Sequence, residues 1–181
     1  KTPWCKREPL AKREKEDYKR FMSLVGKHIV FYSERSGFYK YFQGAVEWLL
    51  ANSDACVHYV TSDPNDQVFK LHEANPRLMP YYIGDKRLIT LMMKLDCDVA
   101  VMTLDDLENF YIKRSYIRKD IEYVYAFHHM TSTHLVCTKE AFDHYDPALC
   151  VGPPPNAELE RAGELRDNPT RTLEDSRYDL P

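Results

Sequence analysis

The chain has 181 residues, 44% of them hydrophobic, which suits one domain with a buried core. Its formal net charge of −3 is too small to indicate a polyanionic partner, and no nucleic acid is expected. No apolar run approaches the ~20 residues of a membrane-spanning helix, and no signal peptide is visible.

Basic residues outnumber acidic ones in residues 1–27, and the pattern predicts a charged N-terminal helix over residues 8–25 that Gly26 ends. Two interpretations stay open for this helix. Its last turn could dock on the domain while the rest faces water. Alternatively, the basic helix could bind an anionic membrane surface.

From residue 28 onward, short apolar strands alternate with helices of about ten residues. This rhythm is typical of a Rossmann-like α/β domain: an open, doubly wound, mainly parallel sheet of about six strands. We expect Asp63 and Pro64 to open one of the helices. The expected strands are residues 28–32, 56–60, 78–83, 99–102, 123–127 and 148–151, and the expected helices are residues 38–51, from 63, and 85–95.

The sequence predicts that this domain covers residues 28–152. Three prolines at 153–155 then break the pattern, and residues 153–181 are expected to form a Pro-rich turn and a charged tail, with residues 167–181 loosely ordered. Among the five cysteines, Cys56, Cys97 and Cys150 adjoin apolar runs, and no CxxC pair occurs. Buried, reduced thiols and a cytoplasmic location follow.

Ligands of open α/β sheets bind beyond the carboxyl ends of the strands. This rule selects the segments 33–37, 61–63, 103–106, 128–134 and 152 onward. In the first segment Ser33, Ser36, Gly37 and the following helix N-terminus could hold a phosphate, or could form a capped turn. The segment is neither GxGxxG nor a P-loop, which argues against nucleotide binding and against a dehydrogenase, and no cofactor is evident.

The segment Phe127–His134 carries the richest chemistry. His128 directly follows the predicted strand 123–127, and an imidazole can accept and donate protons near neutral pH. His129, Thr131 and Ser132 follow and could contact substrate. The alternative is that His128 bonds to a neighbouring carbonyl.

Two further clusters give weaker signals. His129, His134, Cys137 and His144 match no zinc-binding spacing, so no metal is expected. Basic residues alternate with tyrosines over residues 111–123 and could hold a polyanion, although such runs are usually solvated helix faces. The members of this basic cluster are Lys113, Arg114, Arg118 and Lys119, with Tyr111, Tyr116 and Tyr123.

Several long phrases resemble the CDP-glycerol glycerophosphotransferase family, the enzymes that build glycerol-phosphate polymers of the teichoic acid type. The resemblance covers roughly residues 28–152. The phrases are FYSERSGFYKYFQGAVEWLL (31–50), HYVTSDPNDQVF (58–69), YYIGDKRLITLMMKLDCDVAVMTLDDLENFYIKRS (81–115), KDIEYVYAFHHMTSTH (119–134) and AFDHYDPALCVGP (141–153).

The resemblance implies a GT-B architecture, of which this chain is the acceptor-side Rossmann-like half. A second domain, expected to be missing from these residues, would bind CDP-glycerol. An acceptor hydroxyl would attack the β-phosphate and CMP would leave, with His128 as the catalytic base. His129 stands where the family often has a small residue, so either imidazole could face the cleft. The acceptor would be a polyol phosphate at the inner face of the cell membrane.

A second reading is a non-catalytic Rossmann-like module that binds a phosphate-bearing or polymeric ligand. The altered segment after Gly152 and the expected absence of a donor domain favour it. The sequence does not distinguish primer from polymer acceptors or glycerol from ribitol phosphate, and it leaves metal dependence and oligomeric state open.

Overall fold

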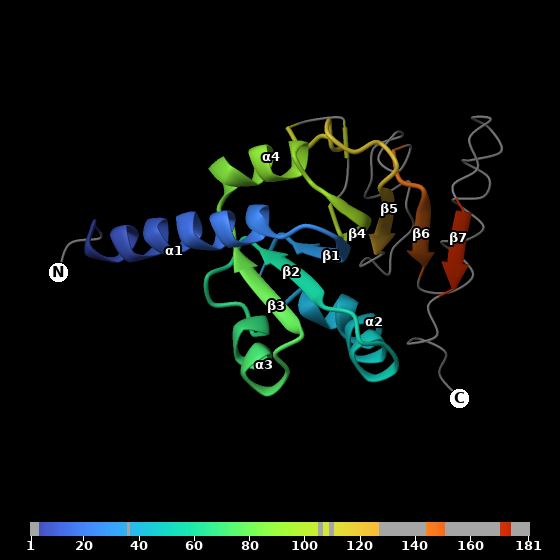
Figure 1. Cartoon of the computed structure of the whole chain (residues 1–181), viewed down its shortest axis with the longest axis horizontal. Helices are drawn as coiled ribbons and strands as arrows, with labels where there is room; N and C mark the ends of the chain where they lie inside the picture. The colour runs from blue at the N-terminus through green and yellow to red at the C-terminus, as the bar shows by residue number, and fades with distance from the viewer. Residues whose placement is uncertain are drawn as a thin grey trace.

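The computed structural model describes residues 4–35, 37–104, 107–108, 111–126, 144–150 and 171–174. Seven strands form one sheet in the order β3-β2-β1-β4-β5-β6-β7 (Figure 1). The elements are α1 (Trp4–Ser23), β1 (Lys27–Ser33), α2 (Tyr39–Asn52), β2 (Val57–Thr61), α3 (Val68–Ala74), β3 (Leu78–Tyr82), α4 (Asp85–Met93), β4 (Cys97–Met102), β5 (Glu122–Ala126), β6 (Pro147–Cys150) and β7 (Arg171–Glu174).

All six strand pairings are parallel, so the predicted α/β, Rossmann-like sheet is confirmed. The sheet has one strand more than expected. Residues 171–174 lie in the segment expected to be loosely ordered, yet they pair with β6 as β7. Backbone pairing needs no apolar side-chain pattern, so this polar strand gave no signal in the sequence.

The two faces of the sheet carry separate buried clusters, as a parallel sheet covered on both sides requires. On one face, α2 and α3 supply Phe42 and Val68 to a cluster with Phe31 and Tyr59. On the other face, α1 and α4 supply Phe21 and Leu91 to the larger cluster. Figure 1 shows α2 and α3 together on one side of the strands and α4 on the other.

The start of α3 differs from the expectation. The carboxylate of Asp63 accepts the backbone N–H of Asn65 (2.9 Å), so Asp63 and Pro64 form a turn instead of opening the helix. Asp66 takes the capping role that was expected of Asp63, since its carboxylate accepts the N–H of Val68 (3.2 Å), the first residue of α3.

Helix α1 closes the free edge of β3. The carboxylate of Asp17 accepts the backbone N–H of Tyr82 (2.9 Å), and that of Glu14 accepts the N–H of Gly84 (3.2 Å). Arg20 donates to the carbonyl of Pro80 and pairs with Asp17 (2.8 Å). Side chains of α1 thus satisfy backbone groups that a neighbouring strand would otherwise take, and an unprotected edge is prone to aggregation.

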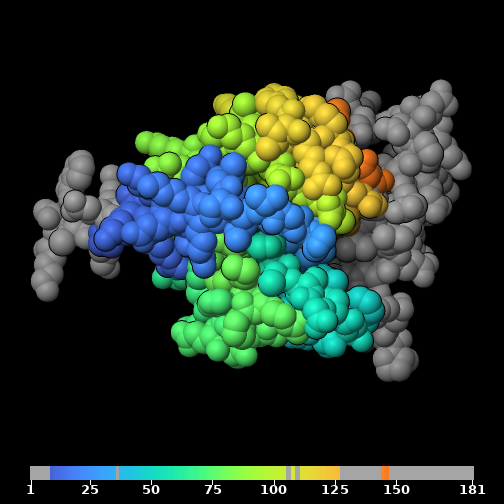
Figure 2. All heavy atoms as spheres, in the orientation of Figure 1, coloured from blue at the N-terminus to red at the C-terminus, as the bar shows by residue number. Residues whose placement is uncertain are grey.

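The helix is therefore docked by its side chains over more than its last turn. In Figure 2 the blue atoms of α1 lie on the surface between α4 and the segment of β3 and α3. At its end, the buried ammonium of Lys27 donates to the carbonyls of Leu24 (2.5 Å) and Phe21 (3.4 Å). A cation at a helix C-terminus offsets the negative end of the helix dipole. No helix in the described ranges is long and apolar enough to cross a bilayer.

We predict that Asp17→Ala lowers the free energy of unfolding by about 1–3 kcal/mol, because it leaves the Tyr82 N–H of an edge strand without its acceptor. Glu16→Ala is the matched control, since the neighbouring Glu16 is exposed and makes only a 3.9 Å ion pair with Lys12. Urea unfolding of both variants measures the difference. Equal stability of the two variants would contradict the edge-closing role of Asp17.

Candidate functional site

The strand order creates a topological switch point at the carboxyl edge of the sheet, between β1 and β4. The connection after β1 is α2, which lies on the face of Phe31. The connection after β4 runs to the opposite face, where Leu107 and Ile121 join the larger cluster. Two neighbouring strands whose connections leave in opposite directions form a topological switch point, the usual ligand position of such sheets.

Three buried hydroxyl groups line up across the strand ends beside this switch point. Thr61 ends β2 and pairs with Ser33, which ends β1. Tyr32 pairs with Met102 at the end of β4, so the next residue, Thr103, lies beside Ser33. All three side chains are at most 1% exposed. Neighbouring parallel strands point paired side chains to the same side, so this hydroxyl row (Thr61, Ser33, Thr103) lies on the α2 face.

Two members of the hydroxyl row have hydrogen-bond partners. Thr61 donates to the carboxylate of Asp66 (2.8 Å) and accepts the backbone N–H of Asp63 (3.2 Å). Ser33 donates to the carbonyl of Arg35 (2.9 Å). Burial raises the pKa of Asp66, and the hydrogen bonds from Val68 and Thr61 oppose that rise.

The third member, Thr103, is different. Among the residues that the structure describes, its Oγ1 is one of two buried side-chain polar atoms without a hydrogen-bond partner; the other is the phenol oxygen of Tyr59. Burying a hydroxyl without a partner costs about 1–3 kcal/mol. Such a group in a native fold calls for a physical explanation.

The turn after β1 leads directly into α2. Gly37 has φ +83°, a left-handed conformation that other residues adopt only with strain. Phe38 occupies the position before the helix and supplies no side-chain cap. The first N–H groups of a helix have no partner inside the helix, and with the helix dipole they favour an anion. Two alternatives were open for this turn, a phosphate site and a capped turn. Phe38 supplies no side-chain cap, and Gly37 with the start of α2 gives a backbone that suits a phosphate.

Of the predicted site residues, the structure brings Ser33 and Gly37 to this edge. Ser36, His128, His129, Thr131 and Ser132 lie outside the described residues. The segment 127–134 follows β5, whose carboxyl end lies beside that of β4 through the pairing of Met102 with Tyr125. Sequence reasoning marked Thr103 only as part of a strand-end segment and missed Tyr59. The hydroxyl row itself follows from the register of β1 with both of its neighbours.

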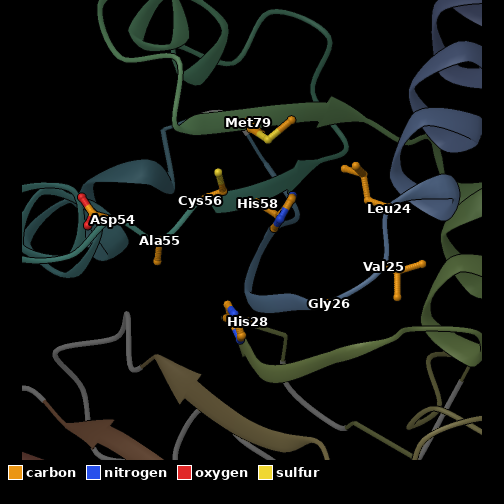
Figure 3. A pocket seen from close by; sticks show the side chains of 9 residues that line it. All are labelled: Leu24, Val25, Gly26, His28, Asp54, Ala55, Cys56, His58 and Met79. Atoms are coloured by element: carbon orange, nitrogen blue, oxygen red, sulfur yellow. The ribbon is translucent and has the colours of Figure 1, made fainter.

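A groove lies at the opposite, amino edge of the sheet (Figure 3). This amino-edge groove has a volume of about 560 Å³ and is mostly apolar, with His58 at the middle of its lining side chains. Its lining residues are Leu24, Val25, Gly26, His28, Asp54, Ala55, Cys56, His58 and Met79. Cys56 is exposed, contrary to the expectation of a buried thiol, whereas Cys97 is buried as expected.

Burial lowers the pKa of His58 to about 4, and the positive charges of Lys27 and Arg20 add to the effect. Its Nδ1 lies 3.1 Å from the hydroxyl of Tyr81. His58 is therefore a neutral imidazole packed into the base of the groove. A base that protonates only in acid is a poor proton acceptor at neutral pH.

The basic cluster, for which a solvated helix face was one interpretation, lies in a loop. Its two arginines form ion pairs with carboxylates of the same chain. Arg118 pairs with Asp98 (2.5 Å), Asp96 (3.3 Å) and Asp120 (3.1 Å). Arg114 pairs with Asp146 (3.0 Å). These contacts hold the connection between β4 and β5 in place, and they occupy the charges that a polyanion would need.

No group of three His, Cys, Asp or Glu side chains in the described ranges could hold a metal ion. Comparison of the chain with models of known protein families, with curated proteins and with solved structures gives no match.

We predict opposite effects for the two threonines of the hydroxyl row. Thr61→Val should lower the free energy of unfolding by about 1–3 kcal/mol, because Asp66 and the Asp63 N–H lose their partner. Thr103→Val keeps the shape and removes an unpartnered hydroxyl, so stability should stay unchanged or rise by up to about 1 kcal/mol. Urea unfolding without added ligand measures both. Equal losses in the two variants would show that Thr103 is hydrogen-bonded.

We also predict that His58 makes stability fall in mild acid. Its pKa is about 4 in the folded chain and 6.5 in the unfolded chain, so the unfolded state binds the extra proton between these values. The contribution of His58 to the free energy of unfolding is therefore fully present above pH 6.5. It is lost as the pH falls towards 4, by about 3 kcal/mol in all. NMR titration of the imidazole and unfolding of His58→Phe, which should flatten the pH profile, test this. An imidazole that titrates near 6.5 would contradict it.

Proposed function

We propose that this domain is the acceptor-side half of a glycerophosphotransferase, which transfers glycerol phosphate from CDP-glycerol to a hydroxyl of a glycerol-phosphate acceptor. The acceptor oxygen forms a bond to the β-phosphorus while the bond from that phosphorus to CMP breaks. CMP leaves with the electron pair, and the hydroxyl proton passes to the imidazole of His128. The long phrases of the sequence that resemble this family suggest the reaction.

One observation carries the proposal: the sheet sets the strand that precedes His128 beside the switch point. β5 ends at Ala126, two residues before His128 in the sequence, and pairs with β4, one of the two strands at the switch point. A base after β5 and an acceptor bound at the ends of β1 and β4 would belong to the same edge of the sheet. The Rossmann-like fold alone hosts many functions, so the argument depends on this placement together with the family phrases.

The described residues suit the acceptor side of such a reaction. Phosphoryl transfer depends mainly on positioning and on stabilisation of negative charge. The uncapped start of α2 and the Thr103 hydroxyl offer N–H and O–H donors at the switch point. The donor nucleotide would be bound by a second domain, as the family resemblance implies.

We predict that His128→Ala lowers the rate of CMP release from CDP-glycerol by about 10²–10⁴-fold, the usual contribution of a general base. The assay should use the longest natural form of the protein that contains these residues, with a glycerol-phosphate acceptor. His129→Ala is the matched comparison, and we expect it to retain more of the rate than His128→Ala.

Near-normal turnover of His128→Ala would refute the base assignment, and a loss confined to His129→Ala would move the role to that residue. If the wild-type protein binds glycerol phosphate yet releases no CMP, the domain is a non-catalytic binding module instead.

A further inference from the structure

The unpartnered hydroxyl of Thr103 lies where the first turn of α2 can share a ligand with it. Val101 and Tyr39, the first residue of α2, belong to the same buried cluster. Thr103 follows Val101 by two residues, so its side chain points to the same face, one step closer to the carboxyl edge. The start of α2 and the Thr103 hydroxyl therefore flank the end of β1 on one side of the sheet.

The Thr103 hydroxyl is not hydrogen-bonded to its neighbour in the row. Ser33 donates to the carbonyl of Arg35. The connection that follows Thr103 leaves to the opposite face, with Leu107 in the larger cluster. Within the described ranges, the Thr103 hydroxyl is buried without a hydrogen bond, which is unfavourable unless a bound ligand completes it.

The second unpartnered hydroxyl, that of Tyr59, belongs to the same face. Tyr59 packs against Phe31, Tyr39 and Phe42, with ring centroids 5.8–6.5 Å apart. Burial raises the pKa of its phenol. The two buried hydroxyls without partners thus come from strands on either side of Ser33.

We propose that the first turn of α2 and the Thr103 hydroxyl together form a binding site for one phosphoryl group. A phosphoryl group has several acceptor oxygens, so one oxygen can accept the N–H groups of Gly37 and Tyr39 while another accepts the threonine O–H. A valine at position 103 would fill the same space without an unsatisfied polar group. The threonine hydroxyl is favourable only when a bound ligand accepts its hydrogen bond. Helix N-termini are favourable places for phosphate.

The charges around the turn suit an anion of low charge. Arg35 and Lys40 stand on either side of Gly37 in the sequence, and both are exposed. Glu34 adds one negative charge, so residues 34–40 carry two bases and one acid, and the Asp66 carboxylate also acts on Tyr39. A phosphomonoester or phosphodiester fits this balance, whereas a polyphosphate would need more positive charge.

The identity of the ligand rests on the proposed function. There the phosphoryl group is the terminal phosphate of the glycerol-phosphate acceptor, and the site would position the adjacent hydroxyl for attack. Free inorganic phosphate has the same chemistry without the glycerol. The two sources are therefore separated by comparing inorganic phosphate with glycerol 3-phosphate.

NMR titration of the ¹⁵N-labelled protein tests the site, with inorganic phosphate and glycerol 3-phosphate as probes at constant ionic strength. We expect the backbone amide signals of Gly37 and Tyr39 to shift in a saturable way. Thr103→Val should weaken binding at least tenfold while its spectrum stays that of a folded protein. Thr103→Ser, which keeps the hydroxyl, should bind within about threefold of the wild-type protein.

Absence of saturable shifts at Gly37 and Tyr39 would overturn the proposal, and so would equal affinity of Thr103→Val and the wild-type protein. The phosphate test does not depend on catalysis. His128→Ala should bind phosphate normally, so binding without any CMP release would refute the transferase and leave the site in place. Transfer activity with Thr103→Val unchanged in both affinity and rate would refute the site alone.

Discussion

The parallel register of β1 with β2 on one side and β4 on the other is the constraint on which the rest of the structure depends. It fixes which side chains face α2 and α3 and which face α1 and α4, because side chains alternate along each strand. A slip of one residue would move Ser33 out of the hydroxyl row and Phe31 out of its cluster. The same register places the ends of β1 and β4 level with each other, so one constraint arranges both the switch point and the core.

That register needs a protected edge, and α1 provides it. Asp17 and Glu14 accept backbone N–H groups at and just after the end of β3. These charged side chains of α1 therefore contact the sheet, although the sequence pattern suggested that they face water. Three lysines, Lys12, Lys15 and Lys19, remain on the outer side of α1. Under the proposed function these lysines are the groups that would meet an anionic membrane surface, each contributing about 1 kcal/mol close to it.

The sequence predicts the strands of this fold well and its polar contacts poorly. Runs such as His28–Tyr32 and Val99–Met102 are apolar on both faces, and that property is local and visible in the letters. The pairing of β7 and the carboxylates of α1 on β3 join residues far apart in the chain, so no local pattern shows them. The same holds at the candidate site. Ser33 and Gly37 were predicted as site residues from a single loop. Thr103 stands out only once the pairing of β4 with β1 places it beside Ser33.

The two edges of the sheet differ in how their polar groups are satisfied, and this difference is the best physical guide to where a ligand binds. At the amino edge, His28 bonds to Asp98 (2.7 Å), Arg118 bonds to the same carboxylate, and the Lys27 ammonium meets two carbonyls. At the carboxyl edge, the structure leaves Thr103 without a partner in the described ranges and starts α2 without a side-chain cap. A groove alone shows available space, but unsatisfied donors show what kind of ligand would be stabilised. The donors at the carboxyl edge are N–H and O–H groups, so the ligand they favour is an oxyanion.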